Sequence, residues 1–141
     1  MYTEVMQDAA LDLLDQGVDT IFYPCMSYNF DEQKGDNHFN CPVVAYYPEL
    51  LASNVEKLKS VRYLYPYLNL SAQKTFPKKV WEALRDYYPD LTLKEVKQAS
   101  ENAYNRYHAQ RMEIKEKGKE ALEFARKHGL KTIILCGRPY H

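Results

Sequence analysis

The stretch that decides the fold is residues 18–54, VDTIFYPCMSYNFDEQKGDNHFNCPVVAYYPELLASN, in which two short apolar runs enclose a polar segment. The first run, residues 18–23, has the length and the β-branched and aromatic content of a buried strand. The second run, residues 42–46, is predicted as another strand. Residues 25–41 between them are rich in Asn, Asp and Gly, so they predict a long loop, and loops of this length are commonly functional.

Helices are predicted on both sides of this stretch. Residues 4–16 carry several apolar side chains, and Gly17 follows them as a stop signal. Thr92 and Glu95 have the spacing of a capping box in front of a long apolar stripe. That stripe predicts a helix of roughly 50 Å at 1.5 Å per residue. The predicted helices cover residues 4–16, 76–88 and 93–128, and a short helix is expected to start at Pro48.

The order of strands and helices favours the α/β class. We expect a mainly parallel sheet with flanking helices, doubly wound (Rossmann-like), plus the long helix. Strands at residues 18–23, 42–46 and 131–135 are expected to share this sheet, with a weaker candidate at 61–65. The 141 residues form about one α/β domain, with a helical region at about 71–129. No helix follows the last strand to cover the sheet, so the chain is expected to be a fragment of a larger protein.

Composition excludes several function classes. Nineteen basic and nineteen acidic residues cancel, so no overall positive field draws the chain to nucleic acid or to acidic lipid. The thirteen tyrosines then predict half-buried packing and not base stacking. No run of about 18 apolar residues and no signal-peptide start occurs, which predicts a soluble cytoplasmic protein.

The three cysteines are the main candidates for a site. An odd number without disulfide-framework spacing indicates free thiols or metal ligands. Cys25 follows a predicted strand almost directly and Cys136 directly, and ligands of open α/β sheets bind beyond the carboxyl ends of strands. We expect these two sulfurs to lie close together. Cys41 reaches Cys25 only if the loop folds back or the second strand is antiparallel. The alternative is that all three are small buried hydrophobic residues.

Other polar residues suggest weaker sites. His38 lies between two cysteines and could complete a zinc or mixed site with nearby carboxylates, although no Cys-x-x-Cys or His-x-x-x-His spacing supports it. Arg138 and His141 could hold an anion or a cluster sulfur by charge-assisted hydrogen bonds. The carboxylates considered beside His38 are Asp31, Glu32 and Asp36.

Catalysis is not indicated by any motif in the chain. The five glycines are scattered, so there is no phosphate-cradling loop and no ATP site is predicted. No serine elbow and no acid pair at useful spacing occurs. A nucleophilic role for Cys25 would require a following helix N-terminus, and the polar residues after it do not predict one.

Three runs, GVDTIFYPC, NCPVVAYYPELL and TIILCGRPYH, resemble the segment appended to the large ATP-dependent activators of 2-hydroxyacyl-CoA dehydratases. That segment is similar in turn to the cluster-binding dehydratase subunits. The resemblance implies an iron–sulfur cluster of the 4Fe–4S type, active in anaerobic metabolism, that passes an electron to a dehydratase forming a ketyl radical. It implies Cys25, Cys41 and Cys136 as metal ligands and Arg138 as a cofactor-binding residue.

The same resemblance implies two partners, an ATPase domain of the same polypeptide and an acyl-CoA dehydratase. The family pattern also places a Cys-Tyr-Pro-like motif before the first helix. This chain begins without it, so the resemblance implies an incomplete cluster here. Three functions stay open: an iron–sulfur-associated electron-transfer or interaction domain of an activator, a small metal-binding or purely structural docking domain, and a cysteine-dependent redox domain.

Overall fold

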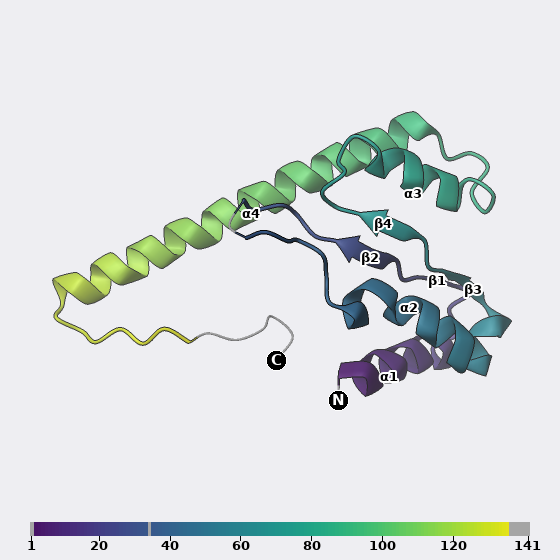
Figure 1. The fold of residues 1–141 in the computed structure, drawn as a ribbon, viewed down its shortest axis with the longest axis horizontal. Helices are drawn as coiled ribbons and strands as arrows, with labels where there is room; N and C mark the ends of the chain where they lie inside the picture. Colours follow the sequence, from purple (N-terminus) through teal and green to yellow (C-terminus); the bar gives the residue numbers. More distant parts are fainter. Residues whose placement is uncertain (1, 34, 136–141) are drawn as a thin grey trace. The chain divides into compact units, whose positions relative to one another are not determined.

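The structure is a computed structural model that describes residues 2–33 and 35–135 (Figure 1). The chain divides into two compact units, residues 1–97 and 98–141. In chain order the elements are α1 (Tyr2–Asp15), β1 (Thr20–Phe22), β2 (Cys25–Tyr28), α2 (Pro42–Asn54), the 3-10 helix η1 (Glu56–Ser60), β3 (Arg62–Leu64), β4 (Tyr67–Asn69), α3 (Phe76–Leu84) and α4 (Leu93–Lys127).

The strands form a parallel ribbon of two chain segments. β1 pairs with β3 through Thr20–Arg62, and β2 pairs with β4 through Cys25–Tyr67. Both pairings join residues 42 positions apart, so the two ladders continue each other in one register. The weaker strand candidate at residues 61–65 is therefore confirmed, and it provides the partner of β1.

A pair of prolines interrupts this ribbon. The shared register places Pro24 opposite Pro66, and proline has no N–H to donate to a ladder. Backbone bonds on either side keep the segments together, from Tyr23 N to Leu64 O at 2.8 Å and from Cys25 N to Pro66 O at 2.9 Å. The β1–β3 ladder therefore ends at the prolines, and the β2–β4 ladder begins directly after them, at Cys25.

The strand predicted at residues 42–46 is wrong, because these residues open helix α2. The run Val-Val-Ala-Tyr-Tyr has high β-propensity, which tertiary packing overrides. Pro42 occupies the first turn of the helix, where its missing N–H costs nothing. Ala45 and Leu51 are buried on its inner face. The expected sheet of three strands at residues 18–23, 42–46 and 131–135 does not form.

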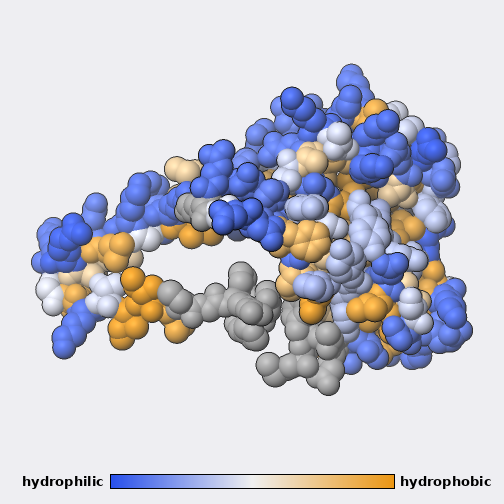
Figure 2. Space-filling model, in the orientation of Figure 1, coloured by the Kyte–Doolittle hydropathy of each residue, from blue (hydrophilic) through white to orange (hydrophobic). Residues whose placement is uncertain are grey.

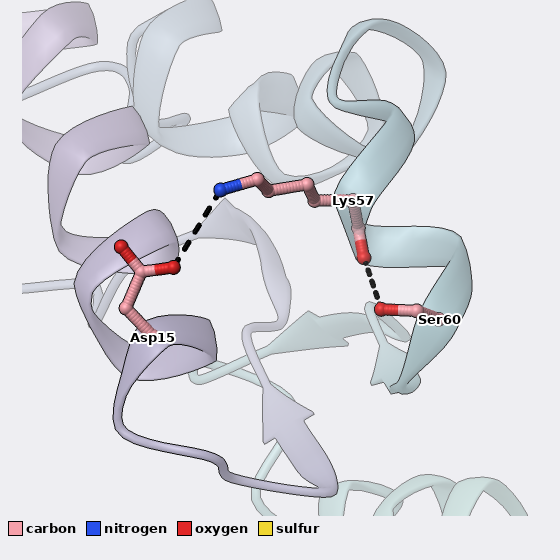
Figure 3. A network of polar contacts seen from close by, with 3 residues as sticks. All are labelled: Asp15, Lys57 and Ser60. Atoms are coloured by element: carbon pink, nitrogen blue, oxygen red, sulfur yellow. Dashed lines mark hydrogen bonds and ion pairs between the residues drawn. The ribbon is translucent and has the colours of Figure 1, made fainter.

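The first unit has its core between α1, α2 and η1. Figure 1 shows α1 and α2 on the same side of the ribbon, and both α2 and η1 contact α1. An exposed ion pair joins Lys57 Nζ of η1 to Asp15 Oδ1 of α1 at 3.5 Å (Figure 3). The side chains buried in this core are Ala10, Ile21, Tyr47, Leu51, Val55 and Leu58.

The helix signals in the sequence are confirmed. Gly17 and Gly129 follow α1 and α4 with φ of 78° and 62°, left-handed values that favour glycine. The capping box forms, since Glu95 Oε2 accepts from Thr92 N–H at 2.9 Å and from the Thr92 hydroxyl at 2.7 Å. These bonds hold the pKa of Glu95 below its usual value. Trp81 of α3 donates its indole N–H to Leu91 O at 2.9 Å, just before α4.

The strand predicted at residues 131–135 is also wrong. These residues pair with no strand in the part of the chain that is described, and their apolar side chains face solvent. Ile133 is 90 %, Ile134 81 % and Leu135 96 % exposed. Figure 2 shows these hydrophobic side chains in the segment that follows α4. A strand needs a neighbour to satisfy its backbone groups, and the apolar pattern alone could not supply one.

The fold is a mixed helix and strand structure with short parallel strands and one long helix. One β-α-β connection is present, from β1 through α2 to β3, where the sequence predicts a strand at residues 42–46 in between. The described residues contain ladders of two strands each, and helices on both faces of a larger sheet are not seen in them. No helix among them is long and apolar enough to cross a membrane.

Candidate functional site

Cys25 lies at the break between the two ladders, with its side chain fully buried. Its backbone is held on one side by β4, through the Cys25–Tyr67 pairing. On the other side α2 packs against β2. The thiol is therefore enclosed between a strand and a helix that lie far from it in the sequence.

Two groups that contact the thiol come from Glu49 and Tyr67. Burial raises the pKa of the Cys25 thiol, and the nearby Glu49 carboxylate raises it as well. A hydrogen bond from the Glu49 backbone N–H and a hydrogen-bonding contact with the Tyr67 side chain act in the opposite direction. The net effect keeps Cys25 a neutral thiol, so it is a poor nucleophile at neutral pH.

Tyr67 connects this buried group to the surface. Its hydroxyl donates a short hydrogen bond to Glu49 Oε2, which raises the pKa of Tyr67 above the ordinary tyrosine value. Its ring is 48 % exposed. Nearby, Tyr63 is half-buried and donates to Pro48 O at 3.0 Å, and burial raises its pKa. Both tyrosines therefore remain hydrogen-bond donors at neutral pH.

Cys41 reaches the same region because the loop folds back. Tyr28 pairs with Phe39 in an antiparallel bridge, and Asn40 N donates to Ser27 O at 2.9 Å. Continuing this register puts Cys41 opposite Met26, and Met26 is the residue that follows Cys25. The loop therefore folds back, as an approach of the two cysteines requires, and the approach of their sulfurs stays a prediction. Cys41 is exposed and occupies the N-cap position of α2, where its side chain makes no capping hydrogen bond.

An exposed row of aromatic rings covers this region, and we call it the aromatic strip: Tyr28, Phe39, Tyr46 and Tyr67. Ring centroids are 5.0 Å apart for Tyr28 and Phe39, 6.4 Å for Phe39 and Tyr46, and 6.2 Å for Tyr46 and Tyr67. The four rings come from β2, the returning loop, α2 and β4. Each of the first three is 38 % exposed.

Helix α2 extends the strip with further apolar surface. Its inner face packs on the core, yet its outer face carries Val43, 36 % exposed, and Leu50, 52 % exposed. Glu49 is the single charged residue in this helix of 13 residues. A helix that is apolar on both faces is expected to be covered on both. The outer face of α2 and the aromatic strip together form a surface suited to binding another molecule.

The remaining predicted site residues lie apart from Cys25 or outside the description. His38 packs its ring against Tyr28, with centroids 5.4 Å apart. Cys136, Arg138 and His141 lie outside the described residues, so the predicted approach of Cys136 to Cys25 stays a prediction.

An iron–sulfur cluster would need more ligands than the described residues bring together. A cubane cluster takes four thiolates. The described residues include two cysteines, and one of them, Cys25, lies near the Glu49 carboxylate. Within residues 2–33 and 35–135 no three cysteine, histidine or carboxylate side chains are placed to hold a metal ion. The predicted zinc group around His38 does not assemble there either.

Sequence reasoning identified Cys25 but missed Glu49 and Tyr67. These two residues come from a helix that was expected to be short and from an unpredicted strand. Tyr-Pro pairs occur at residues 23–24, 47–48, 65–66 and 88–89, so this repeat does not by itself select the register that brings Tyr67 next to Cys25.

Comparison with known families gives a match that covers nearly the whole chain. Residues 3–141 match the family described as CoA enzyme activase uncharacterised domain (DUF2229). Comparisons with curated proteins and with solved structures found no match. The family agrees with the activator resemblance carried by the three sequence runs around the cysteines. The chain therefore belongs to the CoA enzyme activase uncharacterised domain family.

Proposed function

We propose that the domain docks an activase of the CoA enzyme family onto its partner, a 2-hydroxyacyl-CoA dehydratase. In this proposal an ATPase domain of the same polypeptide drives activation, and the present domain supplies the contact surface. The aromatic strip is the observation that carries the proposal. Exposed tyrosine and phenylalanine side chains that touch one another are typical of interface centres.

The chemistry around the strip supports docking over catalysis. The most enclosed reactive group, the Cys25 thiol, is neutral and fully buried, so a substrate cannot reach it. The exposed groups are rings and aliphatic side chains, with hydroxyls that are already hydrogen-bonded in the case of Tyr67. Such a surface gains binding energy from burial.

The test is to change the strip in the full-length activase and to measure dehydratase binding. We expect Phe39→Ser with Tyr46→Ser to weaken binding about 10-fold or more, the loss typical of truncated aromatic hot spots. Phe22→Ser with Tyr88→Ser is a matched control, since these rings are 45 % and 44 % exposed but lie outside the strip. Circular dichroism verifies that both variants fold.

Equal binding by the strip variant and the control variant would contradict the docking proposal. Loss of activation together with unchanged binding would contradict it too, because a docking surface acts through affinity. ATP hydrolysis without the dehydratase is the internal reference, and it should not change in either variant.

A second candidate is an iron–sulfur-associated electron-transfer role, favoured by the fold-back that brings Cys41 next to β2. A cluster held here would provide the low-potential electron, with Cys25 and Cys41 as two of its thiolates. The Glu49 N–H and the Tyr67 hydroxyl would then donate to a cluster sulfur ligand, an arrangement that tunes potential. Further thiolates, with Cys136 as a candidate, would have to complete the set.

Cysteine variants of the full-length activase separate the two candidates. Under anaerobic conditions, Cys25→Ser should lower iron content and electron delivery and leave ATP hydrolysis intact if the cluster proposal is correct. Unchanged iron content in both Cys25→Ser and Cys41→Ser would contradict it and leave docking as the role.

We further propose that strands of the intact activase extend the β1–β3 pair into a doubly wound sheet. A structure of the intact activase would test this.

A further inference from the structure

The neutral net charge of the chain conceals a strong separation of charge along the sequence. Residues 1–56 contain ten acidic residues and one basic residue, a net charge of −9. Residues 57–141 contain nine acidic and eighteen basic residues, a net charge of +9. The acidic part of the chain therefore carries a charge that would favour a basic partner.

Three of the four rings in the aromatic strip belong to the acidic part. Tyr28 and Phe39 stand at the two ends of the loop that carries Asp31 and Asp36, both exposed. The fourth ring, that of Tyr67, donates its hydroxyl to the exposed carboxylate of Glu49. One ring of the strip therefore contacts a carboxylate, and two others are joined by a loop that carries two more.

Hydrogen bonds order the two ends of the loop, next to the rings of Tyr28 and Phe39. Asp31 Oδ1 accepts from Gln33 N–H at 2.8 Å, and Asn37 Oδ1 accepts from Phe39 N–H at 2.7 Å. The side chain of Asn40 also donates to Met26 O at 2.8 Å, which ties the returning segment to β2. Backbone that is already ordered loses less conformational entropy when a ligand binds.

Aromatic rings beside carboxylates suit a guanidinium group in particular. Arginine is planar, stacks on rings and pairs with carboxylates through a fork of N–H donors, whereas lysine offers a compact point charge. The basic part of this chain shows the same chemistry, with Arg62 over Tyr87 at 5.0 Å and Arg85 over Trp81 at 5.1 Å.

We propose that the aromatic strip and its flanking carboxylates bind an arginine-bearing segment of the partner protein. The inference rests on the proposed docking function and adds the chemistry of the partner. Rings of the strip contact the guanidinium faces and the apolar stems, and Asp31 and Asp36 accept hydrogen bonds at the edge of the contact.

Two peptides test this with the 141-residue chain itself: acetyl-Gly-Arg-Leu-Arg-Gly-amide, and the same peptide with both arginines replaced by citrulline, a neutral isostere. We expect the arginine peptide to shift the nuclear magnetic resonance signals of the Phe39 and Tyr46 rings. The citrulline peptide should bind about 5-fold more weakly or worse. Equal binding of the two peptides, or binding of neither, would overturn the inference.

Charge variants give the matched control. Asp31→Asn with Asp36→Asn should weaken the arginine peptide and leave the citrulline peptide unchanged. Asp8→Asn with Asp12→Asn changes the net charge equally on the exposed side of α1, and it should have a smaller effect because screening limits charge effects to about 10 Å at 0.1 M salt. An equal effect of both pairs would overturn a contact at the strip.

The outcomes for this inference and for the docking function are distinct. If the strip variant loses dehydratase binding but the two peptides bind alike, docking stands and the arginine inference fails. If the arginine peptide is preferred and the strip variant still binds the dehydratase fully, the docking function fails. A dimer of the chain alone that Asp31→Asn with Asp36→Asn dissociates would assign the surface to a second copy and overturn a partner protein.

Discussion

Cys25 and Cys41 lie close in register, yet their surroundings are opposite. Cys25 is fully buried against the Glu49 carboxylate, and burial raises its pKa, while Cys41 is exposed at the first turn of α2. Thiol reactivity requires both access and the thiolate form. The buried sulfur therefore acts as a packed, hydrogen-bonded group, and the exposed sulfur is the one that solvent reagents meet.

Alkylation of the native chain should show this difference. With iodoacetamide at neutral pH we expect Cys41 to react rapidly and Cys25 to react only after denaturant unfolds the chain. Mass spectrometry of the proteolytic peptides assigns each site, so Cys136 does not interfere. Equal native rates for Cys25 and Cys41 would mean that the β2–α2 contact opens readily and that Cys25 is not enclosed as described.

The helices were predictable from the sequence because their signals are local. The glycine stops after α1 and α4, the proline in the first turn of α3 and the Thr92–Glu95 capping box each act within a few residues. The strands needed long-range information. A register of 42 positions joins Cys25 to Tyr67, and local patterns do not determine which segments pair. For the same reason residues 42–46 form a helix in spite of their high β-propensity, because packing of α2 against β2 and the core outweighs the local preference.

The capping box makes the start of α4 sensitive to pH. The pKa of Glu95 is lowered by hydrogen bonds from Thr92, so its contribution to stability is present above the unfolded-state pKa of about 4.3 and is lost as pH falls through the lower folded-state value. We expect Glu95→Gln to reduce thermal stability near neutral pH and to approach the stability of the parent as the pH falls below the folded-state pKa of Glu95. Circular dichroism follows the unfolding.

Glu101→Gln is the control for this prediction, because it makes the same chemical change further along α4, beyond its first turn. The interaction of a carboxylate with the helix N-terminus falls off within that turn. If both variants lost stability equally near neutral pH, a general charge effect would explain the loss and the capping box would not.

For the molecule as a whole, apolar surface is left uncovered in both compact units. In the first unit it is the strip and the outer face of α2, and in the second it is the segment after α4 and parts of α4, where Ile114 is 63 % and Phe124 58 % exposed. Contiguous exposed apolar surface marks interaction sites or aggregation-prone segments. Exposed apolar surface in the first unit is the basis of the docking proposal, and that in the second unit gives the last prediction.

Residues 131–135 should make the isolated chain associate with itself. The three apolar side chains Ile133, Ile134 and Leu135 are between 81 % and 96 % exposed, and the run Thr-Ile-Ile-Leu combines high β-propensity with no charge. Unpaired backbone beside such side chains is a template for strand pairing between copies. We expect sedimentation velocity to show concentration-dependent oligomers that Ile134→Lys reduces. Thr132→Lys adds the same charge without removing apolar surface, so it should reduce them less. If the isolated chain stayed monomeric at every concentration, this exposed segment would not drive strand pairing between copies.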